Sequence, residues 1–325
     1  GRFDFLFKHF FNQAISYIEA IDVALKKWKP LLIVTVYEEG AYGRAATIVG
    51  QNKNVPTLAL QHGMVSGDYI PAYYFKSIRF KEGDNPLSCP IPTRTAVYGQ
   101  HTKDILTKKS SYPDESVEVV GMPAIDPALR LLREGKLESV FKFLGISCQK
   151  PIVLVVSQPF FTPEDKNLFI SCILDTVGRD ERIEWVVKLH PSESGTDWKK
   201  SINRRGNCGN LKISDRNMQA WLLVCDAVVS WNSTVMLEAV LFKKTVYALR
   251  ISGSANAEEY ISGGIAVGVN NSDELFNLLR ALLSGSKKRK ELPIKSTKKY
   301  VFQSENYASE IVANLAEKLI NEKRP

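Results

Sequence analysis

Two residues in the first part of the sequence are candidates for catalysis, each at the end of an apolar run. His62 follows the apolar run 57–61 and precedes Gly63, which permits a sharp turn. A neutral imidazole, whose usual pKa is about 6.5, can accept a proton from a hydroxyl group near neutral pH. We therefore predict His62 as a general base, and Glu39, at the end of the apolar run 31–37, as a second catalytic residue. The alternative is a histidine that only holds its turn by hydrogen bonding.

A second histidine is followed by proline at the end of another apolar run. The segment Lys188-Leu189-His190-Pro191 ends the run 183–189, and Pro191 cannot continue a strand ladder. His190 is therefore expected at the end of a strand, where it could contact a phosphate together with Lys188. Pro191 is predicted to belong to the same nucleotide-binding segment. A purely structural strand exit is the other interpretation.

A third cluster combines hydroxyl groups with a carboxylate. Ser233 and Thr234 follow the apolar run 226–230 and open a predicted helix, and Glu238 lies about one turn further on. Free amides and hydroxyl groups at a helix start can bind an anion, although helix capping also explains them. A carboxylate in the position of Glu238 can accept hydrogen bonds from both hydroxyls of a ribose.

Weaker candidates and missing motifs narrow the function further. Ser157 and Gln158 end the apolar run 152–157, where a loop often contacts phosphate groups. The turn 121–126 is expected to be mainly architectural. The sequence has no Walker loop, no GxGxxG after a strand and no GxSxG elbow. These absences argue against a P-loop ATPase, a dinucleotide oxidoreductase and an α/β-hydrolase.

The elements that must position these residues alternate along the chain. Apolar runs bounded by turn residues alternate with stretches of helical periodicity, which indicates βαβ units and mostly parallel sheets. The fold class predicted is α/β, with two doubly wound Rossmann-like domains and a cleft between them. Strands are predicted at 31–37, 57–61, 95–98, 117–120, 152–157, 183–189, 211–213, 226–230, 245–249 and 265–269. Helices are predicted at 3–28, 41–53, 101–109, 126–143, 163–178, 217–224, 233–242, 272–284 and 304–322.

The predicted domains follow from a break in this alternation near residues 145–150. We predict a first domain over 1–145, a nucleotide-binding domain over 146–300, and a C-terminal helix in 301–325 that packs back on the body. The first domain has few strands, so we expect it to be small or truncated. The segment 63–93, rich in Gly, Pro and Tyr, is expected to be a functional loop.

Composition limits the partners and the compartment. The formal net charge of +8 favours an anionic partner. Because the sequence contains no nucleic-acid recognition motif, we do not expect the protein to bind nucleic acid. Five scattered cysteines favour reduced thiols and a cytoplasmic location. The aromatic start, with Phe3, Phe5 and Phe7, could place the protein at the inner face of a membrane; a helix docked on the first domain is the favoured alternative.

Four of these motifs, taken in order, resemble a known superfamily. They match the pattern of GT-B glycosyltransferases, particularly those that build capsule, polysialic acid or teichoic acid polymers. The likeness extends over about residues 30–285. The motifs are Leu-Gln-His-Gly (60–63), Gly-Met-Pro-Ala-Ile-Asp (121–126), Lys-Leu-His-Pro (188–191) and Ser-Thr-Val-Met-Leu-Glu-Ala (233–239).

The resemblance implies roles for the same residues. It implies His62 as the catalytic base, His190, Ser233 and Thr234 as phosphate ligands, and Glu238 as the ribose ligand. It also implies a nucleotide-sugar donor, a glycan or lipid-linked acceptor, and a reaction that needs no metal or other cofactor, because helix dipoles and basic side chains stabilise the leaving group.

Two further functions remain open at this point. A nucleotide-sugar 2-epimerase of the same fold would need several carboxylates near the sugar; Glu38, Glu39, Asp68 and Asp126 are available, but their spacing is not the one expected for this function. A non-catalytic module that binds a nucleotide or a glycan is the third possibility.

Overall fold

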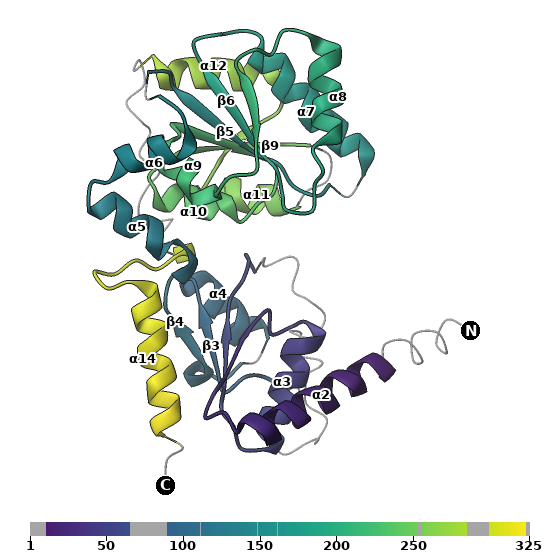
Figure 1. Cartoon of the computed structure of the whole chain (residues 1–325), viewed down its shortest axis with the longest axis vertical. Helices are drawn as coiled ribbons and strands as arrows, with labels where there is room; N and C mark the ends of the chain where they lie inside the picture. The colour runs from purple at the N-terminus through teal and green to yellow at the C-terminus, as the bar shows by residue number, and fades with distance from the viewer. Residues whose placement is uncertain are drawn as a thin grey trace. The chain divides into compact units, whose positions relative to one another are not determined.

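The protein consists of two compact units that are described separately (Figure 1). The computed structural model describes residues 11–65, 90–110, 112–147, 149–160, 162–251, 255–284 and 299–322. The first unit takes the chain up to Ala124 and the C-terminal segment, and the second begins at Ile125. The predicted cleft between the two domains stays a prediction.

The first unit is built on a parallel sheet whose four described strands follow their chain order, β1-β2-β3-β4. These strands are β1 (Ile33–Val36), β2 (Thr57–Leu60), β3 (Arg94–Val97) and β4 (Val117–Val119). The helices are α2 (Asn12–Trp28), α3 (Ala41–Asn52), α4 (Gln100–Asp104) with a π-helical turn over Ile105–Lys109, and α14 (Ala308–Asn321). Helix α3 packs on β1 and β2, and α2 packs on α3.

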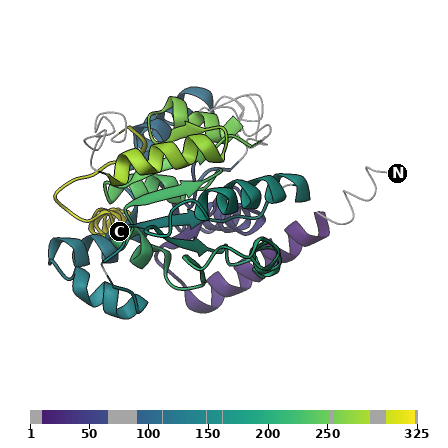
Figure 2. The ribbon, with the colours of Figure 1, turned by 90° about the horizontal axis from the view of Figure 1, so that it is seen from above.

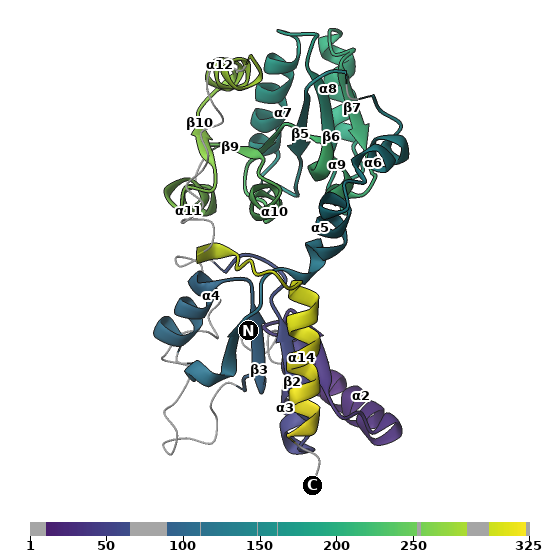
Figure 3. The ribbon, with the colours of Figure 1, turned by 90° about the vertical axis from the view of Figure 1, so that its left-hand side faces the viewer.

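The C-terminal helix completes the core of the first unit. Leu315 and Leu319 of α14 pack against Leu58 of β2 and Ala96 of β3, on the side of the sheet opposite α3 (Figure 3). The chain reaches this position by passing close to the end of β3, where the Phe302 amide donates to the Tyr98 carbonyl at 2.7 Å. Burial of these apolar side chains holds the two ends of the chain in one unit.

The second unit has a six-stranded parallel sheet in the order β10-β9-β8-β5-β6-β7. The strands are β5 (Ile152–Val156), β6 (Glu184–Lys188), β7 (Leu211–Ser214), β8 (Ala227–Ser230), β9 (Thr245–Leu249) and β10 (Val267–Val269). The chain moves outward from β5 through β6 to β7, returns to the other side of β5 as β8, and continues to β10. This is the doubly wound Rossmann order, and its direction reverses between β5 and β8.

Helices cover both faces of this sheet, as a parallel sheet requires. Helices α7, α8 and α12 lie on one face and α9, α10 and α11 on the other (Figure 1), and α12 packs beside α7 (Figure 2). They are α5 (Asp126–Arg133), α6 (Leu137–Leu144), α7 (Pro163–Val177), α8 (Thr196–Arg205), α9 (Met218–Val224), α10 (Val235–Leu241), α11 (Ala255–Ser262) and α12 (Ser272–Leu283). Strand β5 lies at the centre, with every residue buried.

The main differences between the structure and the predicted elements concern helices and the boundary between the two units. The single helix predicted over 126–143 is two helices, because Gly135 adopts a left-handed φ of 69° between α5 and α6. Both pack on α9, so the second unit begins at Ile125, before the predicted boundary at residue 145. Helices α8 and α11 were not predicted.

Several sequence features lie outside the described residues. They are the aromatic positions Phe3, Phe5 and Phe7, the acidic residue Asp68, and most of the segment 63–93. Among the helices that the structure does describe, none is both long enough and apolar enough to cross a membrane.

Candidate functional site

The eight residues that were predicted to bind the nucleotide all line one cavity of the second unit. This cavity, the strand-end cleft, has a volume of about 720 Å³. It is lined by residues 156–159, 188–191, 215–219, 232–235 and Glu238. These segments follow the carboxyl ends of β5, β6, β7 and β8.

The position of this cleft follows from the strand order. Because the chain reverses direction between β5 and β8, the loops after these two strands run to opposite sides and leave a crevice at the sheet edge. Gln158, after β5, lies in this crevice, and its side-chain oxygen accepts a hydrogen bond from the Asn232 amide at 3.0 Å. The side chain of Gln158 therefore joins the two loops at the point of reversal.

Two residues with ionisable side chains, Lys188 and Glu238, line the cleft. Lys188 is buried at the end of β6, and its ammonium group donates to the Leu189 carbonyl at 3.0 Å. Glu238 lies on α10, and burial raises the pKa of its carboxyl group to about 7. Within the described part of the chain, no carboxylate forms an ion pair with this ammonium group, and a buried cation in such a position favours a bound anion such as a phosphate.

His190 occupies a tight turn at the edge of the cleft. The Glu193 amide donates to the His190 carbonyl at 2.9 Å, which closes a four-residue turn with Pro191 in its second position. The Ser192 amide donates to Nδ1 of the exposed His190 ring at 3.2 Å, and the Ser192 hydroxyl lies 2.7 Å from the same nitrogen. The turn therefore occupies one ring nitrogen and leaves Nε2 available.

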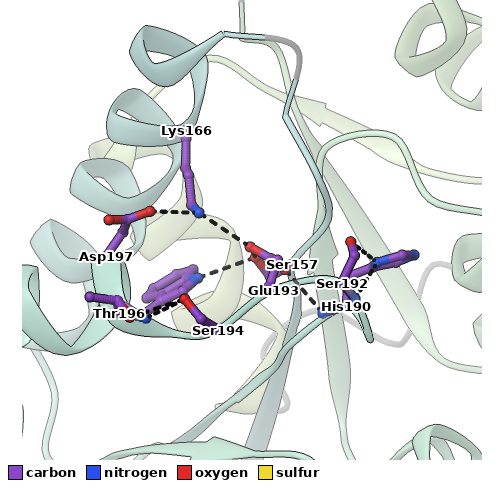
Figure 4. Close-up of polar contacts among 9 residues, drawn as sticks. Ser157, Lys166, His190, Ser192, Glu193, Ser194, Thr196 and Asp197 are labelled. Carbon is purple, nitrogen blue, oxygen red and sulfur yellow. Dashed lines mark hydrogen bonds and ion pairs between the residues drawn. The ribbon is translucent and has the colours of Figure 1, made fainter.

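Glu193 is a residue that the sequence analysis missed (Figure 4). Its side chain is 4% exposed and accepts hydrogen bonds from the Ser157 hydroxyl at 3.0 Å and the His190 amide at 3.0 Å. The Trp198 indole donates to the same Ser157 hydroxyl at 3.2 Å. Ser157, predicted as a phosphate ligand, thus has its hydroxyl engaged within the protein.

The hydroxyl groups of the third motif lie just before α10. The Val235 amide donates to the Ser233 hydroxyl at 3.3 Å, and Thr234 caps the helix without a side-chain hydrogen bond. The predicted helix start at Ser233 is therefore displaced by two residues. Both hydroxyls border the strand-end cleft beside Glu238.

The predicted catalytic pair lies in a small pocket of the first unit, the His62 pocket, with a volume of about 40 Å³. Nδ1 of His62 lies 3.8 Å from a carboxylate oxygen of Glu39, and the Tyr37 ring contacts the imidazole edge-on at 4.4 Å between centroids. The His62 side chain is 45% exposed and the Glu39 side chain 14%. An imidazole that stays accessible beside a shielded carboxylate suits a general base.

The neighbouring acid has a different environment. Glu38 is buried, and its two carboxylate oxygens accept hydrogen bonds from the Thr95 hydroxyl at 2.9 Å and the Tyr112 hydroxyl at 3.2 Å. Gly43 packs directly on the Glu38 backbone, where a Cβ atom would come within 2.6 Å. Of the two adjacent acids, Glu39 is therefore the one that reaches His62.

No protein-family model matches the sequence, and no curated protein matches it either. Solved structures do match in fold. A UDP-GlcNAc 2-epimerase from Neisseria meningitidis bound to UDP-GlcNAc has a TM-score of 0.60 at 16% identity over 94% of this chain and 81% of its own. The Methanocaldococcus jannaschii UDP-GlcNAc 2-epimerase with UDP-GlcNAc and UDP has a TM-score of 0.62 at 17% identity, over 94% and 81%. A glycosyltransferase from Rickettsia africae has a TM-score of 0.57 at 15% identity, over 95% and 82%.

These likenesses define the fold class. The chain has two parallel-sheet Rossmann-like domains of the GT-B type, as predicted, and its structural neighbours are nucleotide-sugar 2-epimerases and a glycosyltransferase. Within the described part of the chain, no group of three or more His, Cys, Asp or Glu side chains is arranged to hold a metal ion.

Proposed function

We propose that this protein is an enzyme that acts on a nucleotide sugar. The nucleotide diphosphate binds in the strand-end cleft, with Lys188, His190, Ser233 and Thr234 at the phosphates and Glu238 at the ribose. The observation that carries the proposal is the gathering of one buried ammonium group, one exposed imidazole and two hydroxyls around a single cavity at the Rossmann switch point.

The comparisons favour 2-epimerisation as the reaction. Two of the reported neighbours are UDP-GlcNAc 2-epimerases that were solved with UDP-GlcNAc or UDP bound. In this reaction the configuration at C2 of the sugar inverts, and the substrate and product are isomers, so no acceptor is consumed. A carboxylate and an imidazole in the His62 pocket would serve the proton transfers.

One observation favours sugar transfer as the second candidate. Both oxygens of Glu38 accept hydrogen bonds from Thr95 and Tyr112, whereas Glu39 lies 3.8 Å from Nδ1 of His62, so one of the two adjacent acids lies beside the imidazole. A single base suffices for transfer. His62 takes the proton of an acceptor hydroxyl, the oxygen bonds to the anomeric carbon, and the bond from that carbon to the diphosphate breaks.

A binding screen and one incubation test these proposals. CMP, CDP, UDP and GDP are titrated calorimetrically into the protein, and we expect at least one nucleoside diphosphate to bind. Lys188→Met is expected to weaken that binding, because it removes the ammonium group, whereas Lys199→Met on the exposed surface of α8 is expected to bind as the wild type does. Failure of every nucleotide to bind would refute the proposal.

The reaction is decided by incubating UDP-GlcNAc with the protein in D₂O without an acceptor. An epimerase that exchanges the C2 proton yields the 2-epimer with deuterium at C2, visible by NMR. A transferase leaves the sugar unchanged until an acceptor glycan is added, and then releases nucleoside diphosphate. The His62→Ala variant serves as the control for spontaneous hydrolysis.

A further inference from the structure

The second unit contains a shielded carboxylate that the proposed reaction does not use directly. Glu193 lies in the loop between β6 and α8, and only 4% of its side chain is exposed. A carboxylate this deeply buried is costly unless hydrogen bonds and a cation compensate it. The hydrogen bonds and the cation around Glu193 must therefore account for its burial.

The carboxylate connects two neighbouring strand ends (Figure 4). One oxygen accepts from the Ser157 hydroxyl, directly after β5, and the other accepts from the His190 amide, directly after β6. Both donors belong to segments that line the strand-end cleft. The Glu193 side chain thus joins the two loops, in addition to the backbone hydrogen bond that the Ser157 amide donates to the Lys188 carbonyl at 3.0 Å.

A lysine on the neighbouring helix balances the charge. The Lys166 ammonium group lies 3.7 Å from Glu193 and 2.7 Å from Asp197, and its side chain is 25% exposed. The stronger contact of Lys166 is with Asp197. Glu193 therefore keeps both oxygens oriented toward Ser157 and His190 while remaining close to a positive charge.

The same turn determines which nitrogen of His190 carries a proton. A backbone amide can only donate, so Nδ1, which accepts from the Ser192 amide, has no proton of its own. In the neutral imidazole the proton must then lie on Nε2. This tautomer offers an N–H donor to an anionic oxygen.

From these contacts we propose that Glu193 is a positioning residue for nucleotide binding, which locks the turn 190–193 so that His190 presents Nε2–H to the diphosphate. The inference rests on the proposed function. Glu193 acts on the imidazole through the backbone amide of His190, and the hydrogen bond from the Ser157 hydroxyl holds the carboxylate in place. Its loss releases the turn from β5, so the imidazole is no longer held in one orientation.

Two substitutions and a matched control test this role. Glu193→Ala removes both acceptors and is expected to weaken binding of the nucleoside diphosphate by about tenfold, equivalent to roughly 1.4 kcal/mol. Glu193→Gln keeps one acceptor and is expected to recover part of the loss. Asp197 contacts the same lysine, Lys166, but neither Ser157 nor His190. We therefore expect the Asp197→Asn variant to bind the nucleoside diphosphate as tightly as the wild type does.

A double-mutant cycle separates positioning from a general loss of structure. If Glu193 acts through His190, the variant carrying both Glu193→Ala and His190→Ala should bind no more than about twofold worse than His190→Ala alone. Additive losses would show that Glu193 works by another route and would overturn the inference. Thermal unfolding of each variant verifies that it is folded at the assay temperature.

An NMR measurement reads the tautomer directly. Long-range ¹⁵N–¹H spectra of the imidazole should show His190 as the Nε2–H form in the wild type and in Asp197→Asn, and a mixture of tautomers in Glu193→Gln. An unchanged spectrum and unchanged binding in both Glu193 variants would overturn the inference. If the wild type binds no nucleotide, the proposed function fails instead, and the two failures are thereby distinguished.

Discussion

His62 and Glu39 form the pair on which turnover is expected to depend. Their separation of 3.8 Å permits the carboxylate to orient the imidazole and to stabilise the imidazolium that forms when His62 takes a proton. The pair lies in a different unit from the nucleotide ligands, so catalysis and nucleotide binding should respond separately to substitution.

We expect His62→Ala to lower kcat by about 10²- to 10⁴-fold, the usual contribution of a general base. The Kd of the nucleotide should remain nearly unchanged, because the strand-end cleft contains no part of His62. Activity assays and calorimetry measure the two quantities. His101→Ala, a histidine on α4 that stacks on Tyr300 outside the His62 pocket, is the matched control and should keep full activity.

The buried carboxyl group of Glu238 should make stability depend on pH. Burial raises its pKa from 4.5 to about 7, so between these values the folded protein holds a proton that the unfolded chain has released. Stability therefore falls as the pH rises through this range, by up to about 1.4 kcal/mol per pH unit.

Glu238→Gln removes this titration. Its free energy of unfolding, relative to the wild type, should increase from pH 4.5 to pH 7 and then stay constant. Urea unfolding at several pH values measures the difference. A difference that does not change with pH would show that the pKa of Glu238 is the same in the folded and the unfolded protein.

At the scale of elements, the C-terminal segment is held by a close backbone contact at the end of β3. A Cβ atom on Gly99 would come within 2.4 Å of the Tyr300 carbonyl oxygen, and the Phe302 amide is hydrogen-bonded to Tyr98 beside it. Because the contact is with backbone, the segment must shift if residue 99 gains a side chain. Helix α14 follows directly and supplies part of the core.

Gly99→Ala is therefore expected to destabilise the first unit by about 1–3 kcal/mol, the usual cost of overpacking. Gly209 is a matched control, since an added Cβ atom there meets nothing within 4 Å and the backbone does not have a positive φ. Urea unfolding followed by circular dichroism compares the two variants. Equal stabilities would mean that the segment adjusts without loss of packing.

At the scale of the molecule, two units with separate cores should unfold in separate steps. Four of the five tryptophans, Trp185, Trp198, Trp221 and Trp231, are buried in the second unit, whereas Trp28 in the first is 72% exposed. Tryptophan fluorescence therefore reports mainly on the unit that contains the strand-end cleft.

A saturating nucleoside diphosphate should stabilise only the second unit, so only the unfolding transition that tryptophan fluorescence follows should shift. A ligand present at 100 times its Kd raises the free energy of unfolding of the unit that binds it by about 2.7 kcal/mol. Circular dichroism, which reports on both units, should show one transition that moves and one that stays. Two transitions that move together would indicate that the units unfold as one.

The fold class and the positions of the strands along the chain could be predicted from the sequence. Short apolar runs bounded by turn residues, such as 152–156, are typical of buried strands, and polar residues directly after such strands lie at the carboxyl edge of a parallel sheet. For this reason Lys188 and His190 after one strand, and Glu238 after another, were expected near the same edge, and all three line the strand-end cleft. Their chemical roles stay predictions.

Tertiary structure decided what local patterns do not contain. Glu193 follows no strand directly and is surrounded by polar residues, so nothing in its neighbourhood distinguishes it from a solvent-exposed acid; only the fold buries it against Ser157 and His190. Gly135 divides a stretch whose periodicity is helical, and α5 and α6 belong to the second unit because of their contacts with α9. Periodicity reports which face of an element is buried, whereas the partner that buries it depends on contacts between residues distant in the chain.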